Sequence, residues 1–225
     1  MGQALGSVLP LAVAIAVFPV PVIAIVLVLG SDDGTAKGLA FAVAWLVGLA
    51  AVGGAALLVG GAADASHDGE TATWVNLLLL GLGLLLVGLA VAEWRSRPGD
   101  GEDVVLPAWM RRVDGLTTAR AGGAGIALSA LNPKNVLLTV AAAAEIAATG
   151  LPAGQQAAVL LVFVVVASVG VLAPLVLSLV LGDRSEALLD GLRVWLVRHN
   201  AAIVTVLFLL IGAKLIGDAV SGLSG

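Results

Sequence analysis

Four long segments of the chain contain no charged residue. They cover residues 1–31, 38–63, 71–92 and 146–182. A helix needs about 20 apolar residues, at ~1.5 Å each, to cross a hydrocarbon layer of roughly 30 Å. Because 60% of the residues are hydrophobic and only 12% are charged, the chain is also too apolar for an ordinary water-soluble domain. The sequence therefore predicts an all-α integral membrane protein.

The apolar segments divide into six predicted transmembrane helices. The run 146–182 must turn once, because Gly150, Pro152 and Gly154 interrupt it. The predicted helices cover residues 5–30, 38–62, 73–92, 121–149, 157–181 and 200–221. Leucines alternate with charges between residues 185 and 198, which favours a helical extension in front of the sixth helix. We expect one transmembrane domain over residues 1–225.

Among the predicted loops and termini, only alternate loops carry basic residues. The loops after the first, third and fifth helices carry nine of them: Lys37, Arg95, Arg97, Arg111, Arg112, Arg120, Arg184, Arg193 and Arg198. The two termini and the other two loops carry none. The positive-inside rule then makes the basic loops cytoplasmic and places both termini on the non-cytoplasmic side of the membrane. In the long loop 93–120, Trp109 beside two arginines fits an interfacial helix, and a plain topology-setting loop remains equally open.

Two of the predicted helices contain proline near their centres. Pro19 and Pro21 lie in the first helix, and Pro133 lies in the fourth. A proline inside a helix removes a donor and frees a carbonyl, which is costly in lipid unless another group compensates. When Pro19 is laid on Pro133, the residues that follow correspond in part. We therefore predict two inverted three-helix repeats, 1–92 and 121–225, joined by the loop 93–120, with helices 1 and 4 broken at proline and the breaks facing each other.

The second break carries a charge. Asn132, Pro133, Lys134 and Asn135 follow one another near the middle of the fourth helix. A cation at that depth costs a few kcal/mol even on membrane-insertion scales, which give the lowest values. Lys134 therefore needs either an ion-pair partner or a functional role. With two amides beside it, Lys134 could hold an anionic headgroup or carry a proton. The structural alternative is an ion pair with Glu145 or Asp218.

Other ionisable residues inside or beside the predicted helices are secondary candidates. Glu145 lies nearer the outer interface, where snorkelling competes with a functional role. Lys214 and Asp218 are four residues apart and can pair on one helix face. Asp32 and Asp33 fit a capping turn better than a gate contact or a proton entry point.

Several function classes are excluded by the composition. The chain has no cysteine, its two histidines have no partners at metal-ligand spacing, and no GxxxxGK[ST] motif is present. We therefore expect no metal, no cofactor, no ATP hydrolysis and no nucleic-acid partner, and we do not expect an enzyme. Small residues on the helix faces allow a homodimer without requiring one.

Three motifs resemble a known family. They are Phe18-Pro19-Val20-Pro21-Val22-Ile23-Ala24, then Gly38-Leu39-Ala40-Phe41 with Trp45, and Leu131-Asn132-Pro133-Lys134-Asn135. With these motifs the chain resembles, over nearly its whole length, the actinobacterial GAP family of peptidoglycolipid- and sulfolipid-addressing proteins in the LysE-like transporter superfamily. The resemblance implies a six-helix inner-membrane protein that helps glycolipids reach the cell envelope, and it adds Trp45 to the secondary candidates.

Three functional hypotheses follow. The leading one is a translocator, not driven by ATP, of an envelope lipid or lipid-linked glycan whose anionic headgroup enters between the two breaks near Lys134. The alternative is a LysE-type exporter of small solutes such as amino acids, because the fold leaves substrate size open. The third is a membrane scaffold that docks envelope-lipid synthases through the loop 93–120. Membrane lipids are expected partners in each case.

Overall fold

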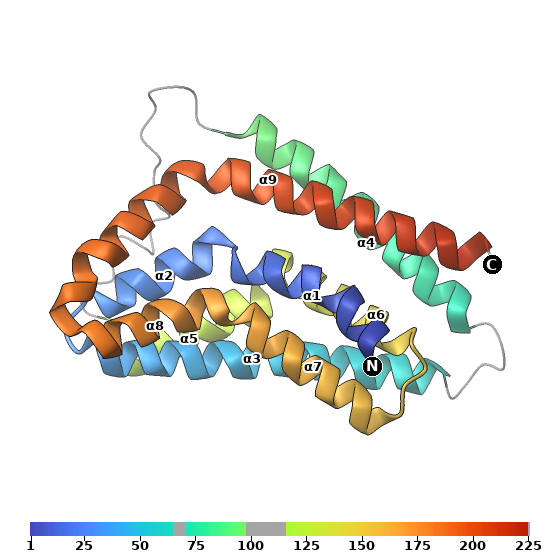
Figure 1. The fold of residues 1–225 in the computed structure, drawn as a ribbon, viewed down its shortest axis with the longest axis horizontal. Coiled ribbons are helices and arrows are strands. Elements are labelled where there is room, and N and C mark those ends of the chain that lie inside the picture. The colour runs from blue at the N-terminus through green and yellow to red at the C-terminus, as the bar shows by residue number, and fades with distance from the viewer. Residues whose placement is uncertain (65–70, 98–115, 225) are drawn as a thin grey trace.

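The structure is a computed structural model that describes residues 1–64, 71–97 and 116–224, and within these ranges all regular structure is helical. Figure 1 shows the arrangement. The elements are α1 (Gly2–Ala16), α2 (Pro19–Leu29), α3 (Gly34–Asp64), α4 (Thr71–Arg95), α5 (Thr118–Ile126), the π-helix η2 (Ala127–Leu131), α6 (Pro133–Ala147), α7 (Ala153–Ala167), α8 (Val169–Leu181), the 3-10 turn η3 (Gly182–Ser185) and α9 (Glu186–Ser224). The predicted interfacial helix around Trp109 lies outside the described residues.

Three helices, α3, α4 and α9, are each long and apolar enough to cross a membrane. Three bent pairs pass the same test when their halves are taken together: α1 with α2, the segment Thr118–Leu131 with α6, and α7 with α8. If each bent pair counts as one span, the described residues form six, and we number the spans in chain order. The protein is therefore a multi-pass, all-helical membrane protein, and its two termini lie toward the same end of the bundle (Figure 1).

Two of the bends occur where proline predicted them. The first span bends by 49° between α1 and α2, and the fourth bends by 55° between Thr118–Leu131 and α6. Pro19 and Pro133 are the first residues of α2 and α6, where the missing proline N–H needs no partner within the helix. The prediction that these two helices break at proline is confirmed.

The fifth span contains a bend that the sequence did not reveal. We predicted one continuous helix over 157–181, and this was wrong, because α7 and α8 meet at Ser168 at an angle of 56°. The Ser168 hydroxyl donates to the Val164 carbonyl at 2.7 Å. Just beyond the bend, a Cβ on Gly170 would lie only 1.8 Å from the Ala16 carbonyl oxygen, so the bent span touches the end of α1 backbone to backbone.

Two helix boundaries differ from those predicted. Helix α4 continues to Arg95, so Glu93, which we expected at the start of the loop, belongs to the third span. Helix α9 begins at Glu186 and runs for 39 residues, which confirms the helical extension in front of the sixth span. Both changes bring polar residues onto helices that pack inside the bundle.

Helix α4 packs against the C-terminal part of α9, whose start turns away from α4, and the two helices form a layer against the other spans (Figure 1). They cross at two glycines. A Cβ on Gly83 would lie 2.9 Å from the Gly212 carbonyl oxygen, and a Cβ on Gly212 would lie 2.9 Å from that of Gly83. Small residues of this kind let membrane helices approach closely. We call these two helices the α4–α9 pair.

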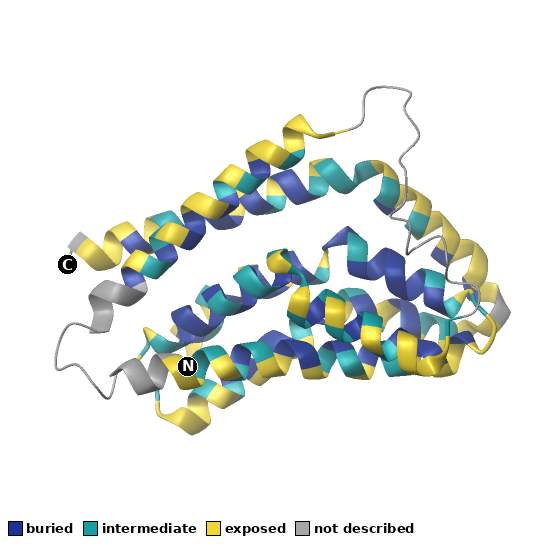
Figure 2. Ribbon diagram, turned by 180° about the vertical axis from the view of Figure 1, so that it is seen from behind, coloured by how far each residue is buried: buried dark blue, intermediate teal, exposed yellow. Residues whose placement is uncertain are grey.

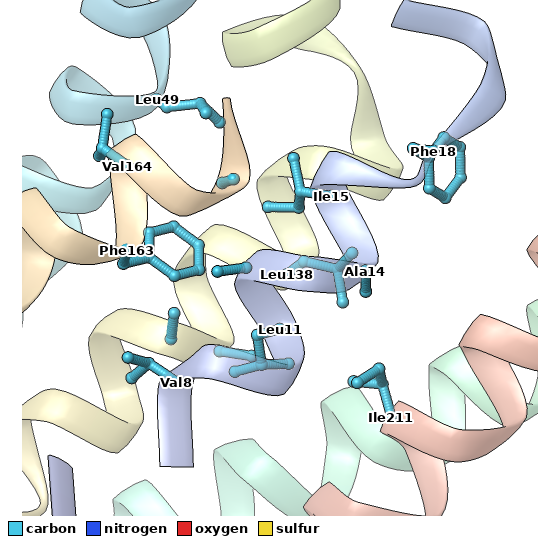
Figure 3. Packing of buried hydrophobic residues seen from close by; sticks show 14 of the residues in the cluster. Val8, Leu11, Ala14, Ile15, Phe18, Leu49, Leu138, Phe163, Val164 and Ile211 are labelled. Carbon is cyan, nitrogen blue, oxygen red and sulfur yellow. The ribbon is translucent and has the colours of Figure 1, made fainter. Parts of the chain in front are cut away.

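The larger apolar cluster of the described residues spans both layers. Leu11 and Ile15 of α1 pack among Leu138 of α6 and Phe163 of α7, as Figure 3 shows. Toward the outside, large apolar side chains are exposed on most helices, and Figure 2 shows the exposed residues along the outward faces. In water such a surface would be unfavourable, whereas in lipid it faces a matching solvent.

Candidate functional site

The break in the fourth span is built from polar groups. Asn132 has an extended backbone, and its side-chain oxygen accepts a hydrogen bond from the Lys134 backbone N–H at 3.1 Å, which caps α6. The π-helix η2 precedes it. Asn135, fully buried, donates from Nδ2 to the Leu128 carbonyl at 2.7 Å and so supplies a partner to a backbone group of the irregular turn. The amide side chains stabilise the opened backbone.

The break in the first span is built from apolar groups. Phe18 is extended and no side chain caps α2. Phe18, Pro19 and Pro21 are all buried. Figure 3 shows Phe18 at the corner between α1 and α2. This break therefore contributes shape and an aromatic ring.

Lys134 lies where four spans converge. Its Nζ forms an ion pair with Glu93 Oε2 of α4 at 2.8 Å. It also lies 5.6 Å from the centre of the Phe18 ring and 5.4 Å from that of Phe208 on α9. These distances are within the range of cation–π attraction. The ammonium group is thus surrounded by one carboxylate and two rings from three other spans.

Asn200 of α9 completes this group. Its Nδ2 donates to Glu93 Oε1 at 3.5 Å, while its Oδ1 is buried and accepts no hydrogen bond from the described residues. The side chains of Lys134 and Glu93 remain 29% and 21% exposed, so a ligand can reach them. We call Lys134, Glu93, Asn200, Phe18 and Phe208 the Lys134 centre.

The structural alternative for Lys134 named the wrong partners. Neither Glu145 nor Asp218 pairs with it, because Lys214 holds both of those carboxylates. Glu93 was missed because it is the first charge after the apolar run 71–92, where a helix end is ambiguous by one turn. Asn200 and Phe208 carry no local signal that points to Lys134.

A second ionic group lies farther along α6 and α9. Glu145 Oε1 accepts a hydrogen bond from Lys214 Nζ at 2.9 Å, and Lys214 also bonds Asp218 on its own helix. This confirms the predicted pairing of Lys214 with Asp218. Of the two alternatives that we left open for Glu145, the structure does not show snorkelling, because the residue is only 8% exposed and its carboxylate pairs with a lysine of another helix. We call these three residues the Glu145 cluster.

The remaining candidates lie elsewhere. Trp45 is fully buried in α3 and stacks on Phe41 at 6.5 Å between ring centres. Asp32 and Asp33 are exposed in the turn between α2 and α3, where their backbone carbonyls bond Lys37. This turn opens α3 through backbone carbonyls, and capping by the aspartate side chains stays a prediction.

An apolar cavity of about 470 Å³ adjoins the fourth-span break. Its walls come from α2, α3, α5 and η2, and Asn132 is the only polar residue among those lining it: Ala24, Leu27, Val28, Phe41, Leu116, Ala124, Ala127, Leu128 and Asn132. Its volume falls within the range of about 300–1,000 Å³ usual for small-ligand pockets. An apolar chain fits such walls better than a charged solute does.

The described residues contain no group of three or more His, Cys, Asp or Glu side chains that could hold a metal ion. His199 stacks on Trp195 with ring centres 4.8 Å apart, and His67 lies outside the described ranges. The site offers the partly exposed ammonium of Lys134, amide groups and an apolar cavity. These are groups that bind and orient a ligand.

Comparison with known proteins gives one match. The family model described as "Sap, sulfolipid-1-addressing protein" matches residues 8–221, which include both breaks, the Lys134 centre and the Glu145 cluster. No curated protein and no solved structure matches the chain. Since the matched region covers nearly the whole sequence, the chain belongs to the sulfolipid-1-addressing protein (Sap) family.

Proposed function

We propose that this protein translocates an envelope lipid with an anionic headgroup across the membrane without hydrolysing ATP. One observation carries the proposal: a single helix break borders both a partly exposed lysine and an apolar cavity. An anionic lipid has the two matching parts, a negative headgroup and apolar chains. The family description, which names a sulfolipid, supports the same substrate class.

The headgroup would bind at the start of α6. Helix N-termini favour anions, because their first N–H groups lack helical partners and the helix dipole is positive there. Lys134, the second residue of α6, adds a full positive charge. In the structure, this ammonium group forms an ion pair with Glu93, and the distance from Lys134 Nζ to Glu93 Oε2 is 2.8 Å. An arriving sulfate or phosphate would therefore have to displace Glu93, and displacement would cut one tie between α6 and α4.

The lipid chains would stay in apolar surroundings throughout. The cavity next to Asn132 accommodates part of a chain within the bundle, and the remaining length stays in the bilayer. This arrangement separates the proposal from the small-solute alternative. An amino acid exporter needs a polar path closed to lipid, whereas all but one of the residues lining this cavity are apolar.

Repeated helix contacts support the inverted-repeat plan. In the second span, a Cβ on Gly48 would lie 2.0 Å from Ser129 Oγ, next to the fourth-span break. In the fifth span, Gly170 makes the matching close approach to Ala16 beside the first-span break. The two breaks are thus each packed by a glycine from the neighbouring span of the other half.

These landmarks also follow the same order in both halves, although their offset grows along the chain. Pro19 and Pro133 are 114 residues apart, Gly48 and Gly170 are 122 apart, and Gly83 and Gly212 are 129 apart. Each landmark of one half thus has a counterpart in the other, in the same order. We propose that rocking of the α4–α9 pair against the other spans exposes the Lys134 centre to alternate sides, as inverted repeats do in other transporters. We retain the orientation with both termini outside.

Reconstituted vesicles test the proposal. The probe is phosphatidylglycerol with a fluorescent acyl chain, and its translocation is read by protection from membrane-impermeant dithionite. We expect Lys134→Gln to slow translocation by about tenfold or more, since a hydrogen bond to a charged group contributes about 1.5–3 kcal/mol. Lys134→Arg should retain most of the rate, and Arg193→Gln, on the exposed start of α9, is the matched control.

Two results would oppose the proposal. Equal translocation by wild type and Lys134→Gln would remove the lysine from the mechanism. Lysine efflux without phosphatidylglycerol translocation would favour the small-solute exporter instead.

A further inference from the structure

The Glu145 cluster joins a buried carboxylate, Glu145, and an exposed one, Asp218, through one lysine. Two carboxylates, Glu145 and Asp218, share the single ammonium of Lys214. The cluster therefore carries one excess negative charge, whereas the Lys134–Glu93 pair is neutral. An ionised carboxylate as buried as Glu145 is costly in a low-dielectric interior, and membrane proteins keep such residues chiefly where ions or protons move.

No other described charge compensates Glu145. Of the helices packed against α6, α7 carries no ionisable side chain, and α1 contributes only the exposed amino terminus of Met1. The ionisable residues of α4 are Glu93 and Arg95 at its far end. Those of α3 are its terminal residues, Lys37 in the first turn and Asp64 as the last residue. Lys214 is thus the cation that Glu145 depends on.

Helix α6 carries its two charges against its own dipole. Lys134 is its second residue, at the positive end, and Glu145 lies two residues before its last residue, at the negative end. Each placement is unfavourable by about 0.3–1 kcal/mol, and each end attracts the opposite kind of ligand. One helix thus presents an anion site at one end and a site for a positive charge about 16 Å away, at ~1.5 Å per residue.

We propose that Glu145 is the proton-binding site that couples lipid translocation to the proton gradient. In this step the Glu145 carboxylate takes up one proton and becomes neutral, while Lys214 keeps its charge. Lys214 then pairs with Asp218 alone, four residues along its own helix. Protonation thereby removes the ion pair that ties α6 to α9, without leaving a buried charge unpaired.

The two ionic groups then lie near opposite ends of α6, and each one joins α6 to the α4–α9 pair. Glu93 and Lys214 both belong to the α4–α9 pair, and both of their partners lie on α6. A headgroup at Lys134 releases one end, and a proton at Glu145 releases the other. This coupling rests on the proposed translocation, but the behaviour of the cluster can be measured without it.

The first experiment measures the cluster alone. Because the chain has no cysteine, spin labels can be placed at Ala148→Cys after α6 and Ala213→Cys on α9, both exposed. In vesicles, we expect the distance between the labels to lengthen on acidification in the wild-type background. Glu145→Gln, which mimics the protonated form, should show the long distance at both neutral and acidic pH. Asp190→Asn, which removes an exposed carboxylate of α9, is the matched control and should behave like wild type.

The second experiment measures coupling. Translocation of fluorescent phosphatidylglycerol is compared with and without an imposed pH gradient. We expect the gradient to accelerate the wild type by about fivefold or more, and to leave the rate of Glu145→Gln unchanged.

The outcomes separate the two proposals. A distance that responds to pH, without any translocation, would refute the lipid function and retain the proton site. If the translocation rate does not change with the pH gradient and the distance between the spin labels does not change with pH, the proton site is refuted and the lipid function is retained.

Discussion

The two proline breaks share a shape and differ in chemistry. The residues Phe18-Pro19-Val20-Pro21 and Asn132-Pro133-Lys134-Asn135 occupy matching positions, and the spans bend there by 49° and 55°. In both, an extended residue precedes a proline at the first position of the second half-helix. The bend therefore depends on the proline and the residue before it, which restricts the backbone in the same way at both places.

The difference lies in the hydrogen-bonding groups that remain. In α2, Pro19 and Pro21 remove two of the first three N–H donors, and no side chain caps the helix. In α6, only Pro133 lacks its donor, and Asn132, Lys134 and Asn135 add polar side chains. The first break is suited to packing and the second to binding an anion.

The largest effect that we predict concerns the glycines that pack the two breaks. Gly170→Ala would place a Cβ against the Ala16 backbone oxygen, which cannot move aside, so we expect a loss of about 3 kcal/mol in the free energy of unfolding. Gly48→Ala would meet the Ser129 hydroxyl, which can rotate at the cost of its hydrogen bond to Gly125, about 1 kcal/mol. Thermal unfolding in detergent measures both, and equal losses would contradict the difference.

An intermediate effect is expected at Asn135, the counterpart of Pro21. Asn135→Leu would leave the Leu128 carbonyl without its side-chain donor inside the bundle, so we expect a loss of about 1–3 kcal/mol. Thr139→Val on the same helix is the matched control, because the Thr139 hydroxyl is buried and bonds no described residue. Thermal unfolding in detergent measures both variants. An equal loss in Thr139→Val would show that the loss in Asn135→Leu does not come from its hydrogen bond to Leu128.

The smallest effect is expected from the prolines themselves. Pro19→Ala and Pro133→Ala should each change the free energy of unfolding by about 1 kcal/mol or less, because both prolines occupy a first helical position. The bend should relax more at Pro19, since Asn132 still caps α6 when Pro133 is replaced. Spin labels on exposed residues on either side of each break measure the change in bend, and a larger relaxation of the fourth span would contradict this.

Local sequence predicted much of this molecule. Apolar length predicted helices of the observed kind, because a chain that crosses lipid must satisfy its backbone within each helix. Proline predicted the first and fourth bends, and four-residue spacing predicted the pair of Lys214 with Asp218. The fifth-span bend at Ser168 had no such signal, because no proline stands at the break itself.

What local sequence determined is thus where each helix runs, where proline breaks it and which charge stands in the polar break. Tertiary structure alone decided which residues meet that charge. Lys134 pairs with Glu93, 41 residues away, and Glu145 pairs with Lys214, 69 residues away. Helix periodicity links only neighbours within one or two turns, whereas partners on separate helices depend on how those helices pack.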